Sequence, residues 1–232
     1  MIGRRVPPGG APDKREGRKR VPRPAPLDAG PNGGHMRWMA APDRDPTTLS
    51  RLAEALGAIA RAKGPPPVER WNPDYCGEID MRIAADGTWF YGGTPIGRPA
   101  LVRLFSTILR RDPERFVLVT PVERVGIVVE DAPFLAVQMV VEGEGEARAL
   151  AFRTNVDDVV SVGPDHPLRF ERDDHDGVKP YVRVRGELWA RVTRALAYDL
   201  VELAEERDGA FGLFAGGGFF PIASAAELDG TR

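Results

Sequence analysis

Cysteine and long apolar runs are nearly missing from this chain of 232 residues, and each absence excludes a class of protein. Cys76 is the single cysteine, so no internal disulfide can form, which is typical of a reducing compartment. No run of about 18 uninterrupted apolar residues occurs, so no membrane-spanning helix is expected. The N-terminal segment also lacks the apolar core of a secretory signal. We therefore expect a cytoplasmic protein.

The common catalytic motifs are absent as well. The chain has no G-x-S-x-G, no H-E-x-x-H, no P-loop and no G-x-G-x-x-G that follows a strand and opens a helix. Only His166 and His175 could act as a base for Cys76, and a spectator thiol fits this cysteine better. The adjacent donors at residues 173–176 (DDHD) point in alternating directions, which favours a solvated hairpin tip over a metal site. We expect no catalytic residue, no metal and no cofactor.

The net charge of −2 is unevenly distributed, with +5 over residues 1–35 and −7 over residues 36–232. An acidic body lacks the basic face of a nucleic-acid-binding protein, so we expect neither nucleic acid nor membrane as a partner. Residues 1–35 consist largely of Pro, Gly and Arg, and such a segment cannot offset the entropy of its own ordering. In a second interpretation, the protein starts at Met36 or Met39.

These patterns divide the chain into four predicted segments, and a predicted helix begins the second of them. Asp45 as N-cap and Pro46 at the first helical position open a predicted helix that ends at Gly64. The predicted organisation is a disordered basic Pro/Gly-rich leader over residues 1–44, an N-terminal α+β domain over 45–122, a C-terminal α+β domain over 123–226 and a tail over 227–232.

The stretch Cys76–Arg111 predicts three strands followed by a helix. Apolar and polar residues alternate over 79–83, as in a strand with one buried face. Asp-Gly at 86–87 supplies the positive φ angles of a two-residue hairpin turn. Pro99 suits the first position of a helix, and apolar residues follow at helical spacing until Pro113.

Short apolar runs alternate with turns in the remainder of the chain. The runs between Phe116 and Arg153 predict an antiparallel sheet. Leu168–Arg172 and Tyr181–Arg185 flank a polar loop, and residues 186–206 predict the longest helix, with apolar residues at steps of four and three. Aromatic runs on both sides of Gly216–Gly218 predict a closing hairpin.

A faint internal repeat runs through this order. Asp-Gly followed four residues later by Tyr occurs at 86–91 and again at 176–181, and each match leads into a predicted helix and then Phe-x-Leu. These patterns favour an α+β fold of duplicated β-hairpin/helix units, with an antiparallel half-barrel as the second half.

Short motifs between residues 71 and 222 resemble, in order, an uncharacterised bacterial family, the domain of unknown function 1285 family. The resemblance implies a duplicated α+β core whose second half is similar to a pleckstrin-homology-like fold. It also implies a small, nucleotide-like ligand between the halves and a role in signalling. The motifs are DGTWFY (86–91), PIGR (95–98), VRLF (102–105), TPVE (120–123), EDAPF (130–134), FRTN (152–155), HP (166–167) and PYVRVR (180–185).

Arginine and aromatic side chains make up the candidate site. Arg98 stands at the first turn of the predicted helix from Pro99, where free N–H groups and the helix dipole favour an anion. Guanidinium groups bind phosphate or carboxylate in a bidentate manner, and aromatic rings stack on a base. We expect arginines to hold the anion, aromatic residues to stack, and Asp and Asn to contact hydroxyl or base edges. The candidate ligand-binding residues are Trp89, Tyr91, Arg98, Arg103, Asp131, Asn155, Tyr181 and Arg183.

The preferred function is a non-catalytic signalling module that binds a small anionic ligand, such as a nucleotide, between the two halves. One alternative is a hydrolase that acts on a phosphorylated or nucleotide substrate through Glu123 and Asp131. Another is a protein-interaction module that uses an exposed sheet edge or the surface at Phe219–Phe220. The sequence predicts no oligomeric state. In a structural interpretation, the arginines instead form ion pairs with Glu78, Asp80, Glu123, Asp131 and Glu187.

Overall fold

The computed structural model describes residues 64–173 and 177–224. They lie in the second of the two units into which the chain divides, Met1–Met39 and Ala40–Arg232. The predicted leader, the predicted helix that begins at Asp45, the donors at 174–176 and the predicted tail lie outside the described residues.

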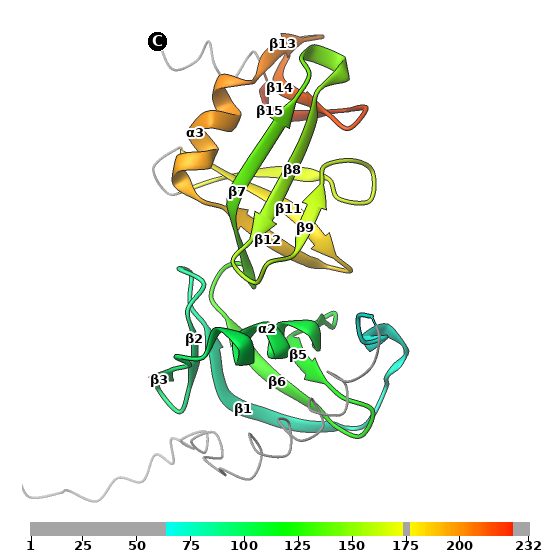
Figure 1. The fold of residues 1–232 in the computed structure, drawn as a ribbon, viewed down its shortest axis with the longest axis vertical. Helices are drawn as coiled ribbons and strands as arrows, with labels where there is room; N and C mark the ends of the chain where they lie inside the picture. The colour runs from blue at the N-terminus through cyan, green and yellow to red at the C-terminus, as the bar shows by residue number, and fades with distance from the viewer. Residues whose placement is uncertain (1–63, 174–176, 225–232) are drawn as a thin grey trace, which may run out of the picture. The chain divides into compact units, whose positions relative to one another are not determined.

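Strands make up half of the described residues, and two α-helices accompany them (Figure 1). The first sheet contains β1 (Tyr75–Ile83), β2 (Trp89–Tyr91), β3 (Thr94–Pro95), β4 (Leu109–Arg111), β5 (Phe116–Val119) and β6 (Arg124–Val129). The second contains β7 (Phe134–Glu142), β8 (Ala149–Thr154), β9 (Val159–Ser161), β10 (Leu168–Arg172), β11 (Val178–Arg185) and β12 (Leu188–Val192). The third contains β13 (Glu205–Arg207), β14 (Ala210–Ala215) and β15 (Gly218–Ser224). The helices are α2 (Pro99–Thr107) and α3 (Arg194–Glu202), and the short 3-10 helices are η1 (Val68–Arg70) and η2 (Gly145–Ala147).

The first sheet has the strand order β3-β2-β1-β6-β5-β4. It consists of two antiparallel three-stranded meanders, which the parallel pair β1–β6 joins. α2 begins at Pro99, whose missing N–H would have no partner at that position. Its Phe105 is fully buried and stacks on Trp89 of β2, so α2 covers the apolar face of the sheet. The predicted order of three strands and a helix is confirmed.

The second sheet repeats this arrangement with the order β9-β8-β7-β12-β11-β10. Two antiparallel meanders are again joined by a parallel pair, here β7–β12. The sheet curls into a half-barrel (Figure 1), and α3 contacts β7 and β11. The predicted half-barrel is therefore confirmed, whereas the expectation of a wholly antiparallel sheet is wrong at β7–β12.

The prediction of one long helix over residues 186–206 is wrong. This segment contains β12, then the shorter helix α3, then β13. Leu188, Ala190 and Val192 are buried while the residues between them are half-buried, which is the period-two pattern of a strand. Apolar residues four apart fit a strand and a helix equally, so the spacing that suggested a helix did not discriminate between the two.

The order of elements that the internal repeat predicts is present in the described residues. Three strands, a helix and three strands occur as β1–β6 with α2, and again as β10–β15 with α3.

β6 pairs with β1 and β5. The first sheet therefore extends past residue 122, where the predicted N-terminal domain ends.

The closing hairpin forms at Gly216–Gly218, as predicted. Gly216 has a φ of 54°, and its N–H donates to the carbonyl oxygen of Arg148 at 3.0 Å. A Cβ added at Gly216 would lie 1.9 Å from the carbonyl oxygen of Val162, whereas at Gly217 (φ 78°) it would meet nothing within 4 Å. The turn is therefore packed directly on the backbone at Val162.

Gly216→Ala should destabilise the protein far more than Gly217→Ala. Both substitutions place a Cβ at positive φ, which costs about 1 kcal/mol. Only at Gly216 must the turn also move away from Val162, which raises the cost to about 3 kcal/mol or more. Urea denaturation followed by circular dichroism measures both losses. Equal losses would show that the turn does not depend on this close approach.

Candidate functional site

Trp89 lies in the core. It is 1% exposed, and its ring stacks on Phe105 with the ring centroids 6.3 Å apart. The strand register pairs Trp89 with Ile83, which places both side chains on the face that α2 covers. Trp89 has no ring face free for a ligand, which corrects its predicted stacking role. Tyr91 is half-buried and packs against the same core.

The predicted arginines differ in their partners. Arg103 of α2 forms an ion pair with Asp157 at 2.9 Å, and Arg183 of β11 forms one with Glu187 at 3.5 Å. Arg98 is the exposed N-cap residue of α2, and its guanidinium has no partner among the described residues. Arg103 and Arg183 therefore follow the structural interpretation, in which arginines bind acidic neighbours.

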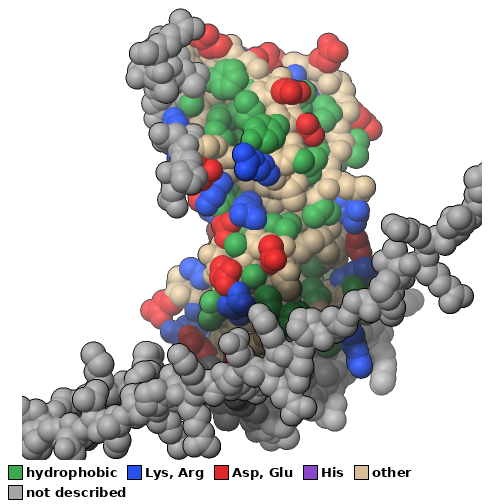
Figure 2. Space-filling model, turned by 90° about the vertical axis from the view of Figure 1, so that its left-hand side faces the viewer, with side chains coloured by type: hydrophobic (Ala, Val, Ile, Leu, Met, Phe, Trp, Pro, Cys, Tyr) green, Lys and Arg blue, Asp and Glu red, His purple; other side chains and the backbone are tan. Residues whose placement is uncertain are grey.

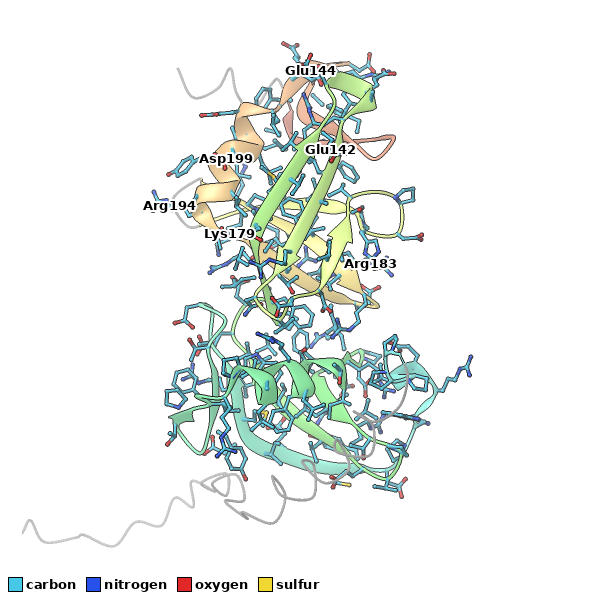
Figure 3. The ribbon with its side chains drawn as sticks, in the orientation of Figure 1. Glu142, Glu144, Lys179, Arg183, Arg194 and Asp199 are labelled. Atoms are coloured by element: carbon cyan, nitrogen blue, oxygen red, sulfur yellow. The ribbon has the colours of Figure 1, made fainter. Side chains whose placement is uncertain are left out.

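The surface charges agree with this pattern of local pairing. On the face in Figure 2, basic and acidic side chains are interspersed. Figure 3 places Arg183 and Arg194 on different sides of the second sheet. That face thus offers no single broad field of positive charge to an anion.

Asn155 binds the backbone of Leu135 through two hydrogen bonds. Its Oδ1 accepts the N–H of Leu135 at 3.0 Å, and its own backbone N–H donates to the carbonyl oxygen of Leu135 at 2.8 Å. Gly87 lies against both residues, because an added Cβ would lie 2.9 Å from Asn155 Nδ2 and 3.0 Å from Leu135 Cδ1. Asn155 therefore fixes the start of β7 beside the β1–β2 turn, a role the sequence did not indicate.

Asp131 and Tyr181 meet, as the prediction requires of two residues in one site. The Tyr181 hydroxyl donates to Asp131 Oδ1 at 2.7 Å, and Arg191 Nη1 lies 3.1 Å from Asp131 Oδ2. Burial, and then the hydrogen bond to Asp131, raise the pKa of Tyr181 above its ordinary value of 10.0. Both carboxylate oxygens of Asp131 are thus engaged within the protein.

The same network holds the β1–β2 turn at Ala85. Arg191 Nη2 donates to the carbonyl oxygen of Ala85 at 2.7 Å, and the N–H of Ala85 donates to Glu130 Oε2 at 2.9 Å. This second bond, followed by the contact with Arg82, lowers the pKa of Glu130. Glu130 and Arg191 together satisfy both polar backbone groups of Ala85.

A pocket of about 500 Å³ has Asp131 in its lining. Two arginines in its walls stack on aromatic rings. Arg111 lies 4.5 Å from the centroid of Phe116, and Arg169 lies 4.3 Å from that of Trp189. The pocket therefore combines flat walls with two planar cations. We call it the Arg111 pocket.

Arg111 carries the unpaired charge of this pocket. It is half-buried at the end of β4 and has no acidic partner among the described residues. Its guanidinium N–H groups are therefore available to a ligand. The other charged side chains of the lining form pairs, namely Asp112 with Arg110 and Arg124, Asp131 with Arg191, Glu187 with Arg183, and Arg169 with Glu171.

The sequence patterns did not indicate Arg111, Arg169 or Trp189 as site residues. Trp189 fell within the wrongly predicted helix over residues 186–206. Arg111 and Arg169 belong to different sheets and line one pocket only through tertiary structure. The available signal was the position of Arg169 between Leu168 and Phe170, an alternation that indicates an outward arginine on a strand.

Other candidate centres carry no site in the described part of the chain. There, no three His, Cys, Asp or Glu side chains are grouped to hold a metal ion. The exposed thiol of Cys76 donates to the carbonyl oxygen of Asp74 at 3.5 Å. Over residues 64–173 and 177–224, the helices are too short and too polar to cross a membrane.

The fold is that of a two-domain, mainly β protein, and the Arg111 pocket is its candidate site. The chain belongs to the DUF1285 family. Residues 66–132 match the N-terminal domain, described as "Domain of unknown function (DUF1285)", and residues 133–222 match the C-terminal domain, described as "Protein of unknown function (DUF1285)". The family resemblance predicted from the sequence motifs is confirmed.

Two solved structures are similar to this chain. A DUF1285 family protein from Silicibacter pomeroyi DSS-3 is 52% identical with a TM-score of 0.69, over 75% of this chain and 97% of that one. A DUF1285 family protein from Shewanella baltica OS155 is 27% identical with a TM-score of 0.42, over 53% of this chain and 91% of that one. No curated protein matches the chain.

Tyr181→Phe should remove much of the stability loss that we expect at alkaline pH. Because the pKa of Tyr181 is raised in the folded protein, the unfolded chain releases this proton first, and stability falls as the pH rises above about 10. Urea midpoints between about pH 8 and pH 11 should fall less steeply in the variant, which also loses about 1 kcal/mol at neutral pH. Tyr198→Phe, at an exposed tyrosine, should follow the parent protein. A profile of Tyr181→Phe as steep as the parent's would contradict the linkage.

Proposed function

We propose that this protein is a non-catalytic signalling module that binds a small anionic ligand, such as a nucleotide, in the Arg111 pocket. The observation that carries the proposal is Arg111 itself, a half-buried cation in a pocket wall with no acidic partner among the described residues. A guanidinium binds phosphate or carboxylate oxygens through two parallel charge-assisted hydrogen bonds.

The flat walls favour a ligand with a planar ring. Arg169 lies over both Trp189 and Tyr181, with its Cζ 4.3 Å and 4.9 Å from the ring centroids. A base can stack on the edge of this array while its phosphate binds Arg111. The volume of about 500 Å³ also suits a small molecule, since such sites commonly measure roughly 300–1,000 Å³.

Binding without turnover fits the state of the polar groups. The Tyr181 hydroxyl already donates its proton to Asp131 in a hydrogen bond, and burial raises its pKa further above neutral pH. Asp131 already accepts from Tyr181 and pairs with Arg191, so each of its oxygens has a partner within the protein. Asp131 and Tyr181 thus shape the pocket, and Arg111 replaces Arg98 and Arg183 as the proposed anion contact.

The signalling part of the proposal depends on the second half of the chain. A pleckstrin-homology-like half-barrel is supported by a curled second sheet whose last strand, β12, leads directly into α3. Folds of this kind host many functions, so the proposal depends on the pocket and its arginine more than on the fold.

Arg111→Ala should strongly reduce ligand-induced stabilisation. Thermal shift measurements with a panel of nucleoside mono-, di- and triphosphates identify a binder, and a ligand at about 100 times its Kd adds about 2.7 kcal/mol. Loss of the bidentate contact should weaken the affinity by about tenfold to a hundredfold, which titration calorimetry measures.

Arg82→Ala is the matched control. Arg82 also stacks on a phenylalanine, with its Cζ 4.3 Å from the ring of Phe90, but it lies outside the pocket and pairs with Glu130. This variant should keep the ligand affinity of the parent. If no nucleotide stabilises the parent protein, or if Arg111→Ala binds as tightly as Arg82→Ala, the proposed function is wrong.

A further inference from the structure

The outer edge of β9 carries unpaired backbone groups. β9 is the last strand on its side of the second sheet, and β8 is its partner among the described residues. Thr154 N–H donates to the carbonyl oxygen of Asp158, and Val162 N–H donates to that of Leu150, both at 2.8 Å. In this register every second residue of β9 faces β8. The N–H and C=O groups of Val159 and Ser161 therefore point away from the sheet.

The exposed side chains on this edge are small or apolar. Val159 is 68% exposed, and Ser161 is exposed beside it. Natural edge strands commonly carry charged residues or proline that prevent pairing with another chain. No charged side chain and no proline stands within β9. β9 is only three residues long, which limits the extent of pairing, and its edge offers the backbone groups of Val159 and Ser161 to another strand.

A second, smaller pocket, of about 250 Å³, adjoins this edge. Its walls include Val159 and Val160 of β9, Val184 of β11, and Pro65. Its volume is below the roughly 300–1,000 Å³ of typical small-molecule sites. A pocket of this size and lining suits one branched apolar side chain.

Three polar side chains of this pocket keep hydrogen-bond acceptor atoms that no described residue occupies. His166 Nδ1 donates to the carbonyl oxygen of Arg183 at 3.0 Å, so Nε2 of the neutral ring is an acceptor. The hydroxyl of Thr107 donates to the carbonyl oxygen of Leu104 at 2.7 Å, which leaves its lone pairs. One oxygen of Asp158 binds Arg185, and the other has no partner among the described residues. Arg185, paired with Asp158, is itself in the lining, and the remaining acceptors match a donor such as a lysine or arginine.

We propose that the outer edge of β9 binds an extended peptide of a partner protein as an added antiparallel or parallel strand. A leucine or valine of the peptide fills the 250 Å³ pocket, and a lysine or arginine two positions along reaches the acceptors of His166 and Asp158. Side chains two apart lie on the same face of a strand, which sets this spacing. The acidic body, with −7 over residues 36–232, attracts a basic peptide. Main-chain pairing supplies affinity, and the pocket supplies specificity.

The test uses the full chain and a blocked octapeptide in which leucine and lysine alternate at every second position, separated by threonine. Fluorescence anisotropy measures the affinity, and amide hydrogen exchange followed by NMR reports on Val159 and Ser161. The peptide should slow exchange of these two amides. A peptide with glutamate in place of lysine should bind at least about tenfold more weakly.

Two substitutions at one position isolate the backbone contact. Val159→Pro removes one outward N–H, which an edge strand tolerates without loss of its pairing to β8, and should weaken binding about tenfold. Val159→Thr keeps the N–H and should bind like the parent. An octapeptide with N-methylated amides gives the same test without changing the protein, and it should not bind.

Several outcomes would overturn the proposal. They are an absence of binding, binding without protection of Val159 and Ser161, and equal binding of the lysine and glutamate peptides. Concentration-dependent self-association that protects the same two amides in the absence of peptide would assign the edge to a second copy of the chain instead. Arg111→Ala should leave peptide binding unchanged, so this result is independent of the proposed ligand site.

Discussion

The candidate site depends on the interactions of the Asp131 carboxylate. It lies just after β6, and its two oxygens divide between Tyr181 of β11 and Arg191 of β12. Arg191 extends the network to the backbone of Ala85. A half-buried carboxylate needs such partners, because an unpaired charge in this position would be strongly destabilising. The walls of the Arg111 pocket are thus positioned by groups that do not themselves have to contact a ligand.

Pairing of charges explains why the chain can be rich in arginine and yet offer few places to an anion. Arg103, Arg153, Arg183 and Arg185 each bind an acidic side chain within the protein. Exposed pairs of this kind contribute little to stability, about 0 to 1 kcal/mol each, but they occupy donors. Arg111 instead has an aromatic neighbour, Phe116, and lies in the wall of a pocket.

Local signals predicted the local structure well. Pro99 and the apolar spacing after it gave α2, and Asp-Gly at 86–87 gave the β1–β2 turn. The segment over residues 186–206 misled because leucines four apart fit both a strand and a helix. The candidate site was harder. The aromatic run Trp89–Tyr91 has no alternation of apolar and polar residues that would mark its buried face, and the presence of Arg111 and Arg169 in one pocket cannot be read from one sequence. Such features arise only when distant strands pack.

Both six-stranded sheets are completed by a parallel pair formed by their first and last strands, β1 with β6 and β7 with β12. The central pair of each sheet therefore has the longest separation along the chain, so the closure entropy of all intervening residues opposes its formation. On the ribosome, the first sheet can close before the second is synthesised, but β1 must wait for β6. Until then β1 has a bare flank, and nascent chains paused in that interval are the ones most exposed to aggregation.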